Sequence, residues 1–202
     1  MSALIDPRNI HSIRHDLYKV GLFILAIWIV FVLDRFLALE ALGLKPRDLR
    51  GVPGIIAMPF LHVDLKHLLG NSVPLAVTLM LLAGSRANSS AIVILIVILS
   101  GAGLWLFGRN ANHIGASGLV FGLITFHIFA GVFERRLRSI FIAIIVGLLY
   151  ASTIIRGVLP FQEGVSWDGH LFGGIAGILV ALASARLLNE ERVQATKKRV
   201  PT

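Results

Sequence analysis

The chain has 202 residues, of which 56% are hydrophobic, and its mean hydropathy is +0.82. This composition excludes a water-soluble globular domain and predicts an all-α polytopic membrane protein, because several apolar runs approach the roughly 20 residues that cross a bilayer. The chain has no cysteine, which excludes disulfides, thiolate nucleophiles and cysteine metal ligands. Its net charge of +8 is better explained by basic loops that meet anionic lipid than by nucleic-acid binding, since no soluble module could present the charge.

Hydropathy predicts one membrane domain over residues 1–202. Its six spans lie at about 18–41, 64–83, 89–108, 115–133, 139–157 and 168–188, followed by a basic, partly frayed cytoplasmic tail at 189–202. The first apolar run ends at Asp34 and Arg35 without a small-residue cleavage pattern, so we expect a retained span and not a signal peptide. Twelve of the 19 lysines and arginines fall on the side of the termini, which predicts that both termini are cytoplasmic. The compact form and the lack of a targeting segment favour a bacterial or archaeal plasma (inner) membrane.

Two outer connections carry apolar residues and prolines. The first, Leu44 to Leu61, holds three prolines among apolar residues, and we expect it to lie at the membrane edge. The connection from Arg156 to Asp168 carries Pro160, Phe161 and Trp167, and we expect it to cap any cavity that opens toward the outer side.

Four polar residues from three different spans fall at one predicted depth. With the termini inside, the second, fourth and sixth spans all run inward. Counted from the charge that ends each span, Ser117, His170, Asn71 and His67 lie roughly 22 to 29 Å above the inner face, at about 1.5 Å per residue. Polar residues in a membrane normally face the bundle interior or a wet cavity and often mark function.

The types of these residues indicate acyl transfer. Serine is a weak nucleophile until a base takes its proton, and neutral histidine is such a base. His67 and Asn71 stand four apart on one helix face, so both can act with the Ser117 backbone N–H as donors to an oxyanion. Asp168 is two residues from His170, which points it away on a helix. We therefore predict a dyad of Ser117 and His170 and no triad.

Small and aromatic residues accompany the polar layer. Gly118 and Gly122 have the spacing that lets membrane helices pack closely, and taken alone they would indicate only helix packing. Gly173 and Gly177 repeat that spacing after His170. Phe121, four residues after Ser117, could hold the imidazole by ring packing.

Together these residues resemble the rhomboid family of intramembrane serine proteases. The resemblance rests on Pro59-Phe-Leu-His62 with His67 and Asn71, on Gly115-Ala-Ser117-Gly118, and on Gly169-His170 followed by Gly173 and Gly177. It implies that Ser117 is the nucleophile and His170 the general base, with His67, Asn71 and the Ser117 backbone as oxyanion donors. The supporting positions are then His62, Gly115, Gly118, Phe121, Gly173 and Gly177. Phe121 departs from the family, where tyrosine is frequent, but ring packing survives the change.

The same resemblance implies cleavage of transmembrane segments of other membrane proteins, within the lipid bilayer and without a metal or a cofactor. The first outer loop would lie at the membrane edge, and Ile140 to Asp168 would be linked to substrate entry. The natural substrate and the oligomeric state are not given by the sequence.

Other interpretations are open. A rhomboid-like protein that binds membrane helices without cleaving them would share the fold. A metal or proton transporter, or a haem carrier, is suggested only by the seven histidines, and the absence of a repeat and of a midplane polar layer argues against it. We expect a packed structural role for His127, with a metal or proton site as the alternative, and a loop position for His113. Pro74 should kink the second span.

Overall fold

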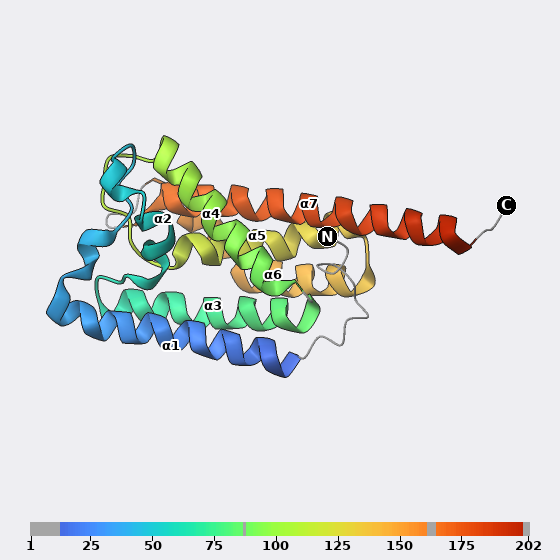
Figure 1. The fold of residues 1–202 in the computed structure, drawn as a ribbon, viewed down its shortest axis with the longest axis horizontal. Helices are drawn as coiled ribbons and strands as arrows, with labels where there is room; N and C mark the ends of the chain where they lie inside the picture. Colours follow the sequence, from blue (N-terminus) through green and yellow to red (C-terminus); the bar gives the residue numbers. More distant parts are fainter. Residues whose placement is uncertain (1–12, 87, 161–164, 200–202) are drawn as a thin grey trace.

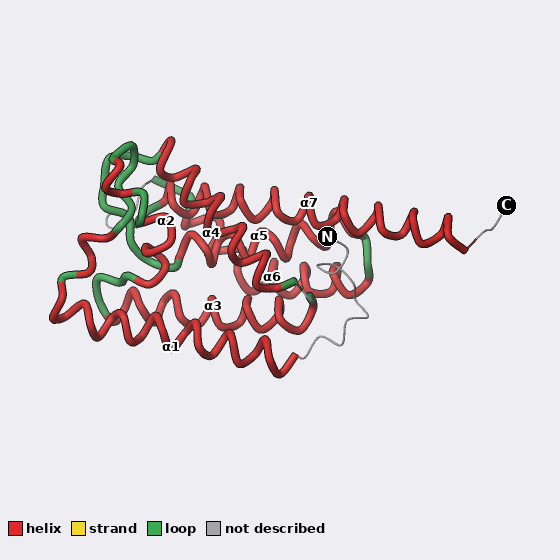
Figure 2. Tube along the Cα trace, viewed as in Figure 1, coloured by secondary structure: helices red, strands yellow, loops and turns green. Residues whose placement is uncertain are grey.

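The computed structural model describes residues 13–86, 88–160 and 165–199. Six of its helices are long and apolar enough to cross a membrane. They are α1 (Ile13–Leu37), α3 (Leu65–Ser85), α4 (Ser89–Phe107), α5 (Ser117–Glu134), α6 (Leu137–Gly157) and α7 (Trp167–Arg199). No strand occurs in the described ranges, which confirms the predicted all-α membrane fold (Figure 2).

Helix α5 is the centre of the bundle. In its membrane-length window 72% of the residues are buried, against 11% in α1 and in α6. It packs against α7, α6, α4 and α3, while α1 lies outside against α3 (Figure 1). The buried side chains between them are mostly Leu, Ile, Val and Phe. Ser117, the first residue of α5, is therefore carried on the element that the other helices surround.

Helices α3, α5 and α7 begin at one end of the bundle and run in the same direction (Figure 1). We call the end with Ser117 the serine end. Helix α1 begins and α7 ends at the opposite end, which we call the terminal end. The parallel course of these three helices places the starts of α3, α5 and α7 together.

The segment between α1 and α3 is folded at the serine end. It contains η2 (Leu39–Leu42), η3 (Leu49–Gly51), α2 (Gly54–Ala57) and η4 (Met58–Phe60). It rests on α4: the Trp105 indole donates to the Asp48 carbonyl over 3.0 Å, and Arg47 donates to the carbonyls of Leu106 and Gly108. The connection between α1 and α3 is thus a structured layer beside the bundle.

Two helices differ from the predicted spans by about a turn or more. Helix α1 begins at Ile13 and ends at Leu37, about one turn earlier at each end than predicted. Helix α7 continues to Arg199, through the segment expected to be a frayed tail. Hydropathy measures only the apolar part of a helix, whereas Glu, Arg, Gln and Ala after residue 189 are good helix formers in water.

Proline and threonine mark the middle of α3. Pro74 lies inside the helix, where it removes one backbone donor. The Thr78 hydroxyl bonds the Pro74 carbonyl over 2.8 Å. His127 Nε2 lies 3.0 Å from the Thr78 carbonyl, so this buried histidine ties α5 to α3 through a backbone acceptor.

Candidate active site

The chain before Ser117 is held on both sides. Leu44 and His113 form an antiparallel bridge, with N–H to carbonyl distances of 3.0 and 2.8 Å. Two residues later the Gly115 N–H donates to the Met58 carbonyl over 2.8 Å. The structured segment between α1 and α3 therefore fixes where α5 begins, and Ser117 follows directly as its first residue, half-buried.

Gly115 is required by its backbone and by its surroundings. Its φ of +113° is one that side chains with a Cβ rarely adopt. A Cβ there would lie 2.7 Å from His67 Nε2 and 3.4 Å from Asn71 Nδ2. Both side chains on α3 thus converge on the backbone two residues before Ser117.

The start of α3 orients these two residues. Asp64 is the N-cap, and its carboxylate accepts the His67 N–H over 2.7 Å. His67 and Asn71 then project from the same face one turn apart. Asn71 is buried, and its Nδ2 has no hydrogen-bond partner among the described residues. A buried amide donor without an acceptor is costly, which is typical of a site that is completed by a ligand.

Helices α5 and α7 approach each other through glycine. A Cβ on Gly118 would meet the Gly169 carbonyl carbon and oxygen at 3.9 and 3.3 Å, and one on Gly173 would lie 3.0 Å from Gly118 Cα. Gly177 packs in the same way on the Gly122 carbonyl. This contact of backbone on backbone brings the Ser117–Gly118 and Gly169–His170 pairs to one level.

His170 is fixed on two sides. Its ring stacks on Phe121 with the centroids 4.1 Å apart and the planes 3° from parallel. Its Nδ1 lies 2.7 Å from the Gly157 carbonyl at the end of α6. A carbonyl can only accept, so Nδ1 carries the proton, and Nε2 of the neutral ring is left as the acceptor. No hydrogen bond joins Nε2 to Ser117 among the described residues. Such contacts are often long in the absence of substrate.

His62 lies behind His67. It is fully buried, and its ring centroid is 5.0 Å from that of His67 in an edge-on arrangement. Neither ring nitrogen makes a hydrogen bond of good geometry in the described part of the chain, although the Phe60 backbone lies close enough to favour the charged form. Burial, aided by the charge of His67, lowers the pKa of His62 to about 4. The ring is therefore neutral near pH 7.

Asp168 forms no hydrogen bond with the His170 ring in the described part of the chain. Its carboxylate accepts from the Arg109 backbone N–H at 3.0 Å and from the Arg109 guanidinium at 3.3 Å. It also accepts from the Ser166 hydroxyl at 3.1 Å, and His113 Nδ1 lies 2.7 Å from the same hydroxyl. This cluster of Arg109, His113, Ser166 and Asp168, which we call the Arg109–Asp168 latch, ties the end of α4 and the segment before Ser117 to the start of α7.

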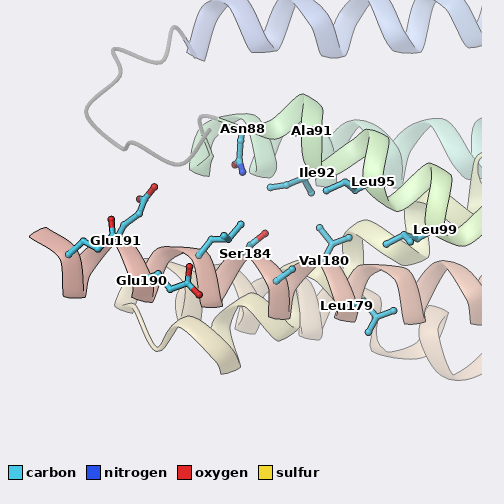
Figure 3. A pocket seen from close by; sticks show the side chains of 13 residues that line it. Asn88, Ala91, Ile92, Leu95, Leu99, Leu179, Val180, Ser184, Glu190 and Glu191 are labelled. Atoms are coloured by element: carbon cyan, nitrogen blue, oxygen red, sulfur yellow. The ribbon is translucent and has the colours of Figure 1, made fainter. Parts of the chain in front are cut away.

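An apolar groove of about 660 Å³ lies elsewhere, between α4 and α7 (Figure 3). Ile92, Leu95 and Leu99 face Val180 across it, and Glu190 and Glu191 lie at one end. It contains neither Ser117 nor His170, so it is distinct from the polar site at the serine end.

The family model of the Rhomboid domain matches residues 50–187. The chain belongs to the rhomboid family. It is similar to uncharacterized proteins of Mycobacterium tuberculosis and Mycobacterium bovis, each 37% identical over 172 residues, with 79% of this chain and 71% of each relative covered. An uncharacterized protein of Mycobacterium leprae is 32% identical over 171 residues, with 79% and 67% covered. The chain is thus a multi-pass rhomboid membrane protein in contact with lipid, in a family of intramembrane proteases.

Two features of this rhomboid site escaped the sequence reasoning. The Gly157 carbonyl on His170 Nδ1 leaves no mark in a sequence, because every residue has a carbonyl. The Arg109–Asp168 latch did leave a signal. Arg109 follows the third predicted span and Asp168 begins the sixth, so these opposite charges lie on the same predicted side of the membrane. The expected cap at Arg156 to Asp168 is described only in part, since Phe161 lies outside the described residues.

Proposed function

We propose that this rhomboid is an intramembrane serine endopeptidase that cleaves transmembrane segments of other membrane proteins with a dyad of Ser117 and His170. The observation that carries the proposal is the hydrogen bond from His170 Nδ1 to the Gly157 carbonyl. It leaves Nε2 as the basic nitrogen, on a ring that Phe121 holds in place. A neutral histidine so oriented is a base that can take a hydroxyl proton.

In the acylation step Ser117 Oγ forms a bond to the scissile carbonyl carbon, and its proton passes to His170 Nε2. The imidazolium is stabilised by the Gly157 carbonyl, which replaces the carboxylate of a triad. The negative charge on the carbonyl oxygen is stabilised by Asn71 Nδ2, His67 and the Ser117 N–H, which has no acceptor within the helix because it lies in the first turn.

Collapse of this intermediate breaks the C–N bond, and His170 returns the proton to the leaving amine. A water molecule then attacks the acyl-enzyme, with His170 again as the base, and Ser117 is regenerated. No step requires a metal or a cofactor. A substrate helix would partly unwind before reaction, because a helical backbone hides its carbonyls from Ser117.

The pattern of charges supports a plasma-membrane location with both ends of the chain cytoplasmic and the serine end outward. In that orientation the polar site lies near the outer surface, where water for deacylation can reach it. The histidines outside the site do not favour a transporter. His127 and His113 are both engaged by protein acceptors or hydroxyls.

The test is cleavage in proteoliposomes that contain the full chain and a panel of single-span membrane proteins with helix-breaking residues near the outer end of the span. We expect cleavage by the wild type and none by Ser117→Ala or His170→Ala. The matched control is Ser100→Ala, which removes a buried hydroxyl in α4 whose hydrogen bond among the described residues goes to the Val97 carbonyl. Wild-type turnover in Ser117→Ala would refute the proposal. If the wild type binds members of the panel but cleaves none of them, a non-catalytic binder of membrane helices is favoured.

A further inference from the structure

A small basic pocket lies at the terminal end, away from Ser117. Its volume is about 110 Å³, room for about three to four waters. It is formed where α3, α5 and α6 meet. Its polar lining residues are Ser85, Arg86, His127, Arg136, Arg138 and Ser139.

Positive charge in this pocket exceeds negative charge. Arg86 pairs with the buried Glu134 over 2.5 Å, and the second oxygen of Glu134 accepts the Ser139 hydroxyl over 2.7 Å. Both oxygens of this carboxylate are thus engaged. Arg138 donates to the Gly84 carbonyl, and neither Arg136 nor Arg138 forms an ion pair with a carboxylate in the ranges that the structure describes. Three arginines face one glutamate, which leaves two positive charges.

Arg136 lies among other positive charges. Burial lowers the pKa of Arg136, and the positive charges of Arg192 and Arg86 lower it further, more than Glu134 alone can offset. Arg136 is also the N-cap residue of α6, and its side chain caps no backbone N–H. The N–H groups at the start of α6 that have no acceptor within the helix and the positive end of the helix dipole therefore add to the attraction for an anion.

Exposed apolar side chains lie on the same first turns of α6 as the arginines of the pocket. Leu137 is 88% exposed and Phe141 is 65% exposed, both on the first turns of α6. In a bilayer such side chains contact acyl chains, while arginines at the ends of spans lie at the level of the headgroups. A ligand that joins a phosphate to an acyl chain would satisfy both surfaces at once, whereas free phosphate would satisfy only the basic one.

We propose that the pocket formed by Arg86, Arg136 and Arg138 binds the phosphate of an anionic phospholipid headgroup at the terminal end of the bundle. Arg136 and Arg138 supply the uncompensated charge. Arg86, which forms an ion pair with Glu134, lines one side of the pocket. The bound lipid bridges the α3–α4 connection and the start of α6, and so fastens α6 to the rest of the bundle at the end opposite to the Gly157 carbonyl.

The test is native mass spectrometry of the full chain in detergent, titrated with phosphatidylglycerol or with phosphatidylcholine of the same acyl chains. We expect one retained phosphatidylglycerol, preferred over phosphatidylcholine. Arg136→Gln and Arg138→Gln should each weaken its retention by about fivefold, since each arginine near an anionic surface is worth about 1 kcal/mol. The control is Arg156→Gln, the same charge change at the other end of α6, where the side chain is exposed. It should leave retention unchanged.

Equal retention of the two lipids, or equal loss in Arg156→Gln and Arg136→Gln, would overturn the proposal. A parallel titration with inorganic phosphate distinguishes the two sources of the phosphate. No displacement of phosphatidylglycerol by excess phosphate supports the lipid. If phosphate raises the thermal midpoint of the wild type but not of Arg136→Gln, and no lipid is retained, the ligand is not a lipid and the proposal is overturned. Circular dichroism of each variant checks that the helices are intact.

Discussion

Gly157→Ala should damage the site although residue 157 has no reactive group. An added Cβ would lie 2.9 Å from Phe121 Cε1, closer still to Cζ of that ring, and 3.1 Å from His170 Nδ1. The Phe121 ring, the imidazole or the end of α6 must therefore move. Overpacking of this kind costs about 1 to 3 kcal/mol. If that cost falls on the orientation of His170, the rate of acylation drops by roughly 5- to 150-fold.

The assay is the second-order rate of Ser117 modification by a fluorophosphonate probe, followed by intact mass. The matched control is Gly147→Ala on the same helix, where an added Cβ meets nothing within 4 Å. It should keep the wild-type rate. Phe121→Leu combined with Gly157→Ala should recover part of the loss, because the smaller side chain frees the space and the two effects are then not additive. Equal rates in Gly157→Ala and Gly147→Ala would refute the idea that the Gly157 carbonyl orients the base.

Three further results are expected. The stability that neutral His62 confers should be complete above pH 6.5. It should fall by up to about 1.4 kcal/mol per pH unit toward pH 4, because only the unfolded chain binds the proton there. The thermal midpoint of His62→Gln should lack this dependence on pH, and the same dependence in the variant and the wild type would contradict the prediction. Gly173→Ala should destabilise the bundle by about 1 to 3 kcal/mol, whereas Gly174→Ala, in ordinary contact with Thr125 Cγ2 at 3.5 Å, should melt like the wild type. Asp168→Asn should slow probe labelling by about fivefold with the fold intact, since an ion pair between a half-exposed arginine and a buried aspartate is worth about 1 kcal/mol. An unchanged rate would show that the Arg109–Asp168 latch does not position the site.

The placement of the site on the helices followed from residue spacing. His67 and Asn71 are four apart, so a helix had to put them on one face, and the structure brings both to Gly115. Phe121 lies on His170 because four residues separate it from Ser117 along α5, beside the helix that carries the imidazole. These contacts depend on side chains at a fixed helical period, and a sequence records them directly.

Contacts made by the backbone could not be predicted in the same way. The carbonyls of Gly157 and Met58 position His170 and Gly115, but only the folded chain shows which carbonyl lies within reach. The length of α7 was underestimated because the predicted span ended where apolar residues end. Glu134 marked the end of a span in the sequence, and its burial against Arg86 appears only when α3 and α5 are packed together.

The most direct test of the central claim is labelling of the detergent-purified full chain with a fluorophosphonate, read as intact mass and mapped to a residue. We expect one adduct, on Ser117, that is absent in Ser117→Ala and in His170→Ala and unchanged in Ser100→Ala. Labelling of His170→Ala at the wild-type rate would refute the proposed dyad, because Ser117 would then react without the base that the Gly157 carbonyl and Phe121 hold in place.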